Sequence, residues 1–403
     1  MKSNWKAWLQ SLIPGIITAA VVFGPSKVTI ASKMGAQYNS SLLWVLVIAI
    51  FFMAIYTNIS SRIGLATENS ILTTIRSKWG RAVSGIIGFG VFLVCTAFQA
   101  GNAVGVGIAI GEFTHTAYRP WMIIISIAAI ALLFARRFYT ILSRVMIGIV
   151  ILMLFSFLVT CFLSHPAAGD VLNGLIPTMP KGAETLVIAF VASCFSIVGA
   201  FYQSYLVQQR TARLTAEKRA AMKDRSLTGM IILGIMSAAV MLCAAAVLHP
   251  RNIQVQSATD MGKALEPLFG LSASRLFLMG LFGSSFSALV GNSVLGGTVF
   301  SDALGWGNSM DQPVVKVCIA VIIALGAALA WVFGSMPLEM IVFAQGITIL
   351  IVPVIGLALL LISCDSKIMG ERKNTLFYTI SAIAGLVLLL VLAAINIKNL
   401  FFK

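Results

Sequence analysis

Apolar stretches of about 20 residues recur along the whole chain and are separated by short polar segments. Each is long enough to cross a bilayer as a helix, because the hydrocarbon core is about 30 Å thick and a helix rises about 1.5 Å per residue. We expect eleven spans, at residues 9–37, 41–64, 83–111, 119–136, 140–163, 183–208, 226–248, 274–303, 313–334, 338–362 and 374–397. The pattern predicts an all-α integral membrane protein in which residues 1–403 form a single transmembrane domain.

The first span is interrupted in its middle by Gly24-Pro25-Ser26-Lys27. Proline breaks the helical hydrogen-bond pattern, and an ammonium placed in the bilayer costs at least about 2.5–3.5 kcal/mol. The second half of a broken helix begins with unpaired N–H groups and the positive end of its dipole. Span six carries Ser193, Ser196 and Gly199 near its centre, where we expect a second, weaker break.

A loop rich in proline and glycine, residues 164–184, divides the first five spans from the next five. Two five-span halves of opposite orientation are typical of an inverted-repeat transporter, whose binding site lies where interrupted helices meet. We therefore expect repeats at about residues 9–163 and 183–362, with an additional helix at 374–397.

Composition and charge fix the class of protein. The chain is 59% hydrophobic and only 10% charged, with a mean hydropathy of +0.98. Most Lys and Arg residues lie at segments that face the cytoplasm if the N-terminus does, so we expect a multi-pass cell-membrane protein with a cytoplasmic N-terminus and an extracellular C-terminus. The net charge of +15 comes from Lys and Arg residues with this asymmetric distribution, so no nucleic-acid partner is expected. The basic segment 210–225 either contacts anionic lipid of the bilayer or acts as a solvated topology determinant.

Three runs of the sequence resemble a known family. The run MGAQYNSSLLWVLVIA, SYLVQQR at the end of span six and GNAVGVGIAIG in span three resemble motifs of the NRAMP family of metal-ion transporters. The resemblance implies the inverted-repeat fold named after the leucine transporter, with helices 1 and 6 broken.

The site motifs of that family are altered here. Aligned on the first run, the metal-binding Asp of the family falls on Gly24 and its metal-binding Asn falls on Lys27. In span six the family's Met-Pro-His becomes Ser196-Ile197-Val198, so a sulfur ligand and an imidazole are lost. A further family histidine falls on Gln203.

Two more family positions lie in spans three and ten. The acidic proton-relay pair of span three falls on Gln99 and Asn102, whereas the glutamine of span ten remains as Gln345. A divalent cation normally needs an anionic ligand, and an ammonium about 4 Å away repels it by roughly 8 kcal/mol at an effective dielectric constant of about 20. These departures predict that metal transport by the family's mechanism is disabled.

The residues favour an anion instead. Two helix N-termini near the bilayer midplane and Lys27 would attract a small anionic solute, of the bicarbonate or short-carboxylate type. The nearest acidic residue in sequence, Glu68, lies beyond the next span. Our main hypothesis is therefore a secondary anion transporter that works by alternating access, as a symporter with proton or sodium as the coupling ion. The alternatives are a divalent metal-ion transporter (manganese, iron or magnesium) with a rebuilt site, or a transport-dead sensor or partner subunit.

The candidate residues fall into two groups. We expect the substrate site to be formed by Gly24, Pro25, Ser26, Lys27, Ser196, Gly199, Ala200 and Gln345, and the coupling pathway by Gln99, Asn102, Tyr202 and Gln203. Lys27 either contacts substrate or has a structural or proton-carrying role, and the pathway residues either line a hydrated path or hydrogen-bond between helices. Lys33, near the end of span one, is interpreted as reaching toward the membrane interface. No cofactor, no metal site and no catalytic constellation is recognisable, so an enzyme is not expected.

Overall fold

The computed structural model describes residues 23–134, 136–211, 226–333 and 337–401. The described chain is all-helical, without β-strands. Its long helices are α2 (Pro25–Tyr38), α3 (Leu43–Ala66), α4 (Ile71–Thr114), α5 (Tyr118–Leu132), α6 (Arg136–Leu163), α8 (Glu184–Cys194), α9 (Ile197–Thr211), α11 (Ser226–Val247), α14 (Ala273–Leu304), α15 (Pro313–Phe333), α16 (Pro337–Thr348), α17 (Val352–Ser363) and α19 (Leu376–Phe401).

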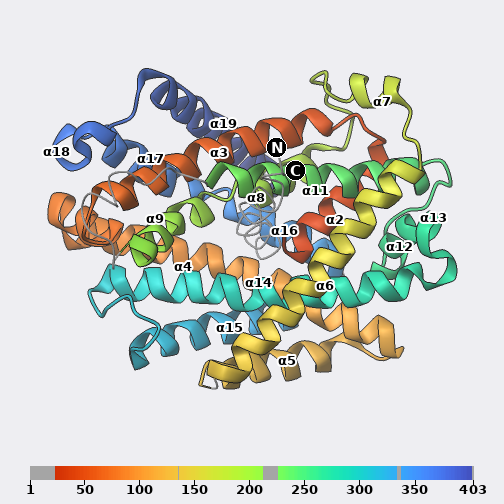
Figure 1. The fold of residues 1–403 in the computed structure, drawn as a ribbon, viewed down its shortest axis with the longest axis horizontal. Coiled ribbons are helices and arrows are strands. Elements are labelled where there is room, and N and C mark those ends of the chain that lie inside the picture. Colours follow the sequence, from red (N-terminus) through yellow and green to blue (C-terminus); the bar gives the residue numbers. More distant parts are fainter. Residues whose placement is uncertain (1–22, 135, 212–225, 334–336, 402–403) are drawn as a thin grey trace, which may run out of the picture.

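Short helices connect them. They are α7 (Ala168–Asn173), α12 (Ala258–Gly262), α13 (Glu266–Phe269) and α18 (Ser366–Met369), with the 3₁₀ turns η1 (Lys263–Leu265), η2 (Gly270–Ser272) and η3 (Gly370–Arg372). In Figure 1 the long helices α4 and α14 run side by side through the middle of the molecule, with α15 and α5 on one side and α3 on the other.

The described helices are consistent with the expected membrane spans. Seven are long and apolar enough to cross a membrane, or eight if the bent pair α16–α17 is one span, and two shorter apolar helices lie at 118–132 and 147–163. The number of eleven spans stays a prediction, and the first half of span one, the basic segment after α9 and both chain ends lie outside the described residues.

The break expected in span six is present, and the described part of span one begins as a helix at the expected position. Helix α2 begins at Pro25, directly after the break in span one, and α8 ends at Cys194 while α9 begins at Ile197. A third break was missed: span ten bends by 41° between α16 and α17. The residues between them, 349–351, carry no helix-breaking signal, and the nearest proline after them, Pro353, lies in the first turn of α17.

Small residues allow the helices to approach closely. A Cβ atom on Gly35 of α2 would lie 2.1 Å from the backbone oxygen of Met241 and 2.9 Å from the Cβ of Ala244, both on α11. In a membrane, where lipid is as apolar as leucine, such close packing is a main source of helix association. Glycine at position 35 therefore fixes the distance between α2 and α11.

This contact gives a stability prediction. Gly35→Ala should destabilise the protein by about 1–3 kcal/mol, because the added methyl cannot fit against backbone without moving a helix. Gly85→Ala in α4 is the matched control, since no atom lies within 4 Å of its Cβ position. Thermal unfolding in detergent should show a lower transition temperature for Gly35→Ala only; equal transition temperatures would contradict the packing account.

Candidate functional site

A cavity of about 440 Å³ lies where the two helix breaks meet. Its walls come from α2, α3, α4, α8, α9, α14 and α16. Its principal polar lining residues are Ser26, Lys27, Thr57, Asn102, Ser193, Ser196, Tyr202, Gln203, Gln209, Asn292 and Gln345. The cavity extends from the breaks along α9 to Gln209 and to Met230 at the beginning of α11, so it reaches one end of the molecule.

The break in span one places two polar side chains on the cavity wall. Gly24 has an extended backbone (φ −78°, ψ 173°) and precedes the first turn of α2, which contains Ser26 and Lys27. Both side chains are buried, at 5% and 7% exposed, and both line the cavity. A lysine is thus built into the cavity wall beside the break, where the sequence analysis expected it.

The break in span six supplies backbone groups of both polarities. Phe195 has non-helical dihedral angles (φ −85°, ψ 61°), and the hydroxyl of Ser196 accepts a hydrogen bond from the N–H of Gly199 (3.3 Å). The last carbonyl groups of α8 and the first N–H groups of α9 meet here. Sequence reasoning considered only the N–H groups, whereas the carbonyl end of α8 carries the opposite partial charge.

Gln345 connects α16 to the first break. Its Nε2 donates a hydrogen bond to the Oγ of Ser26 (2.8 Å), a contact between residues 319 positions apart in sequence. This bond leaves the Oε1 of Gln345 as an acceptor. Asn102 donates to the Oε1 of Gln99 (3.4 Å), and the Oδ1 of Asn102 lies 3.6 Å from the position of a Cβ on Gly24. Amide oxygens from α16 and α4 therefore lie around the first turn of α2.

The structure brings most of the predicted residues to this cavity. Gly24, Ser26, Lys27, Ser196, Gly199, Gln345, Asn102, Tyr202 and Gln203 line it. Pro25, Ala200 and Gln99 are not in the lining: Pro25 packs against Gly105, Ala200 is fully buried, and Gln99 packs against Gly326. Whether the lining residues bind substrate stays a prediction.

Two lining residues of α3 were missed. Thr57 is 2% exposed, and its hydroxyl has no hydrogen-bond partner among the described residues. Met53, one helical turn before it, also lines the cavity, and its terminal methyl carbon Cε lies 3.8 Å from the Cβ position of Gly199. Neither is marked by a break or a charge; the one available signal is a polar threonine inside an otherwise apolar span.

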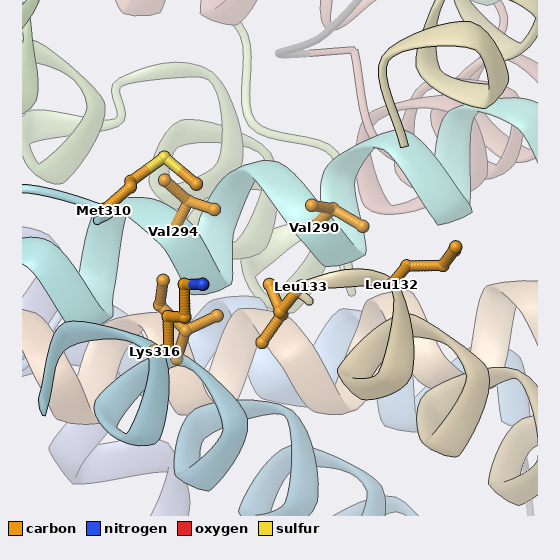
Figure 2. Close-up of a pocket in the computed structure, with 7 residues that line it drawn as sticks. Leu132, Leu133, Val290, Val294, Met310 and Lys316 are labelled. Carbon is orange, nitrogen blue, oxygen red and sulfur yellow. The ribbon is translucent and has the colours of Figure 1, made fainter. Parts of the chain in front are cut away.

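A second, smaller cavity of about 30 Å³ adjoins the first (Figure 2). It is lined by Leu132, Leu133, Val290, Val294, Met310, Lys316 and Ile319, and it shares Val294 and Met310 with the central cavity. Lys316 lies with its Nζ 5.3 Å from the ring centre of Phe134. This mostly apolar space has too few polar groups to hold a polar ligand.

Acidic residues are absent from the described lining of the central cavity. Within the described residues no group of three or more His, Cys, Asp or Glu side chains could hold a metal ion. The ligands that the cavity offers are therefore neutral oxygens, backbone carbonyls and the thioethers of Met53, Met230 and Met310.

Comparison with known proteins decides the family. The profile described as "Natural resistance-associated macrophage protein-like" (Nramp) matches residues 15–399, nearly the whole chain. The chain belongs to the Nramp family. The family resemblance noted from the three sequence runs is confirmed, and the protein is a multi-pass membrane protein of a transporter family.

Named relatives are distant but align over most of their length. The divalent metal cation transporter MntH of Deinococcus radiodurans is 23% identical over 96% of this chain and 88% of its own. MntH of Verminephrobacter eiseniae is 23% identical over 96% of this chain and 89% of its own.

Solved structures confirm the fold. The manganese transporter of Eremococcus coleocola superposes with a TM-score of 0.79 at 17% identity, covering 99% of this chain and 88% of that one. MHP1, a nucleobase-cation-symport-1 family transporter, gives 0.55 at 15% identity, covering 96% and 92%. The leucine-transporter-like fold expected from the sequence is therefore confirmed.

These relatives correct the functional hypothesis. The predicted small-anion transporter, its anion symport and its anionic solute partner are wrong, because the relatives are named divalent metal cation transporters and manganese transporters. The physical error was to weigh Lys27 and the N–H ends of the broken helices without the opposing groups. The carbonyl end of α8 and the oxygens of Gln345, Asn102 and Thr57 face the same cavity.

Proposed function

We propose that this Nramp protein transports a divalent metal cation through the central cavity, with a rebuilt site of neutral ligands. The observation that carries the proposal is the convergence of oxygens from α2, α3, α4 and α16 on one cavity in a protein whose relatives are named divalent metal cation transporters. Ser26, Gln345, Asn102 and Thr57 supply these oxygens. Hydroxyl, amide and water oxygens suit hard cations such as Mg²⁺ and Mn²⁺.

The cavity is roomy enough for a partly hydrated ion. A water molecule occupies about 30 Å³ in the liquid, so a volume of about 440 Å³ holds a cation together with several of its waters. Mg²⁺ in particular gives up its waters reluctantly. An ion that keeps several waters needs only a few ligands from the protein.

Lys27 sets the strength of binding. The Lys27 ammonium in the wall, without a carboxylate among the described lining residues, opposes a dipositive ion. The proposed site is therefore weak, with half-saturation in the millimolar range, and suits a cation that is abundant rather than scarce. No enzymatic activity is part of this proposal.

The proposed orientation follows the distribution of Lys and Arg along the chain. We place the N-terminus and the segment after α9 in the cytoplasm and the C-terminus outside, in the cell membrane. In this orientation the central cavity extends toward the cytoplasm along α9, and the end of α2 at Tyr38 lies on the outer side.

Isothermal titration calorimetry of the purified protein tests the site. Gln345→Ala should weaken Mg²⁺ and Mn²⁺ binding about tenfold, since loss of one hydrogen-bonding or ligating group costs about 1–1.5 kcal/mol. Gln256→Ala is the matched control, because Gln256 is exposed and lies far along the chain from the cavity walls. Equal binding by the two variants would place the cation elsewhere, and no binding by any protein would favour a transport-dead sensor.

Met53→Leu tests, in the same assay, whether the site distinguishes soft metal ions from hard ones. The change removes the thioether of residue 53 and nearly conserves the volume of the side chain. The free energy of unfolding should therefore change by less than about 1.5 kcal/mol. A thioether favours softer metals. We expect Cd²⁺ binding to weaken several-fold and Mg²⁺ binding to stay as in the wild type; parallel losses would indicate a packing effect.

A further inference from the structure

Two polar contacts join the antiparallel helices α2 and α16 on the outer side of the cavity. The contact at the cavity is the hydrogen bond from Gln345 to Ser26. The contact farther from the cavity is an ion pair between Lys33 and Glu339. Along each helix the two contacts are six or seven residues apart, about 10 Å at about 1.5 Å per residue. Together they close the seam between α2 and α16 above the cavity.

The two side chains of the Lys33–Glu339 pair differ in exposure. The Lys33 side chain is 5% exposed, whereas the Glu339 side chain is 61% exposed. The sequence-based interpretation of Lys33 as an interface-seeking side chain is therefore wrong: it is buried and held by a carboxylate from a distant helix. Glu339 also lies in the first turn of α16, where the helix dipole favours a negative charge.

Glu339 is thus largely exposed on the protein surface while Lys33 engages it from within the protein. A carboxylate can accept either an ammonium or a hydrated divalent cation, and the two compete for the same oxygens. Since α2, α8 and α16 pack on one another, a movement of α2 away from α16 opens a path along this seam toward the cavity. The ion pair holds these helices together.

We propose that Glu339 is the entry residue for the cation and that Lys33 occupies it while the outer path is closed. An arriving divalent cation takes the carboxylate from Lys33, which releases α2 from α16 and exposes the path to the cavity. The inference rests on the proposed cation transport and adds a residue outside the central site that selects for positive charge.

A cysteine reporter on α2 tests the proposal directly. Thr29 lies three residues after Ser26 and four before Lys33, on the same face of the helix, and is fully buried. Its hydroxyl has no hydrogen-bond partner among the described residues, so Thr29→Cys removes no such contact. In a background with the six native cysteines replaced, the labelling rate by a hydrophilic maleimide measures opening of the seam.

We expect Lys33→Met and Glu339→Gln each to raise the labelling rate at least tenfold without any metal. Glu266→Gln is the matched control, because it breaks the more exposed Arg251–Glu266 pair, which does not involve α2. In the protein with Lys33 and Glu339 intact, millimolar Mg²⁺ or Mn²⁺ should accelerate labelling at least threefold. In Glu339→Gln the metal should have no further effect.

The outcomes separate this proposal from the function it rests on. Labelling as slow in Lys33→Met and Glu339→Gln as in their parent would overturn the role of the pair, whatever the central cavity binds. Metal that accelerates neither protein, or accelerates both equally, would overturn the entry role of Glu339. The proposed function is tested independently, by calorimetry of cation binding at the central site.

Discussion

Replacing Lys27 by methionine should strengthen divalent-cation binding by at least about 30-fold. Two unit charges about 4 Å apart interact by about 1 kcal/mol even at the dielectric constant of water, so a dipositive ion gains about 2 kcal/mol when the ammonium is removed. Lys27 is 7% exposed, so the effective dielectric constant is below that of water, and removal of a protonated lysine gives a larger gain. Methionine keeps an unbranched side chain of similar length. Calorimetry with Mn²⁺ and Mg²⁺ measures the change.

Lys316→Met is the matched control for this prediction. It removes a lysine from the small neighbouring cavity, which shares walls with the central one but not its polar groups. Its cation affinity should stay within about threefold of the wild type. A Lys27→Met protein that unfolds at the wild-type temperature but binds cations no more tightly would show that the cation does not sit beside Lys27.

The double change Gly24→Asp with Lys27→Asn should have a larger effect, about a thousandfold tighter binding than in the wild type. It removes the positive charge and adds a negative one, each worth about 2 kcal/mol against a dipositive ion by the same estimate. Gly24 is the N-cap of α2, a position at which aspartate is strongly preferred. Its Cβ would lie 3.2 Å from the Cβ of Ala288, so only a shift of a few tenths of an ångström is needed.

The pair Gly24→Asn with Lys27→Asn controls for shape in this experiment. Asparagine has the size of aspartate but no charge, so this protein should bind no more tightly than Lys27→Asn alone. If both double variants bind equally, the gain comes from packing or from an added neutral oxygen, and the electrostatic account fails.

The sequence predicted the fold because its signals are local and strong. Apolar runs of about 20 residues, the Gly-Pro pair in span one and the small residues of span six mark the helices and two of the three breaks. The bend between α16 and α17 was not predicted, because no proline and no pair of glycines precedes it at Thr348. Gln345 was expected at the site only through the family resemblance, and its hydrogen bond to Ser26 was not predicted.

The site was predicted less completely, because its neutral ligands lack local signals. Lys27 was found because a charge in an apolar run is conspicuous, and it dominated the hypothesis about the substrate. Thr57 and Met53 are ordinary residues in a transmembrane helix until α3 is placed beside the break at Gly199. Lys33 was misread because its carboxylate partner is 306 residues away in sequence.

The central claim is that this protein moves divalent cations across a membrane through the cavity beside Lys27. Proteoliposomes loaded with a fluorescent divalent-cation indicator measure this most directly. The account predicts saturable Mn²⁺ or Mg²⁺ flux with half-saturation in the millimolar range, shifted to higher concentration by Gln345→Ala and to lower concentration by Lys27→Met. Flux no greater than that of protein-free liposomes, for the wild type and for Lys27→Met alike, would contradict it.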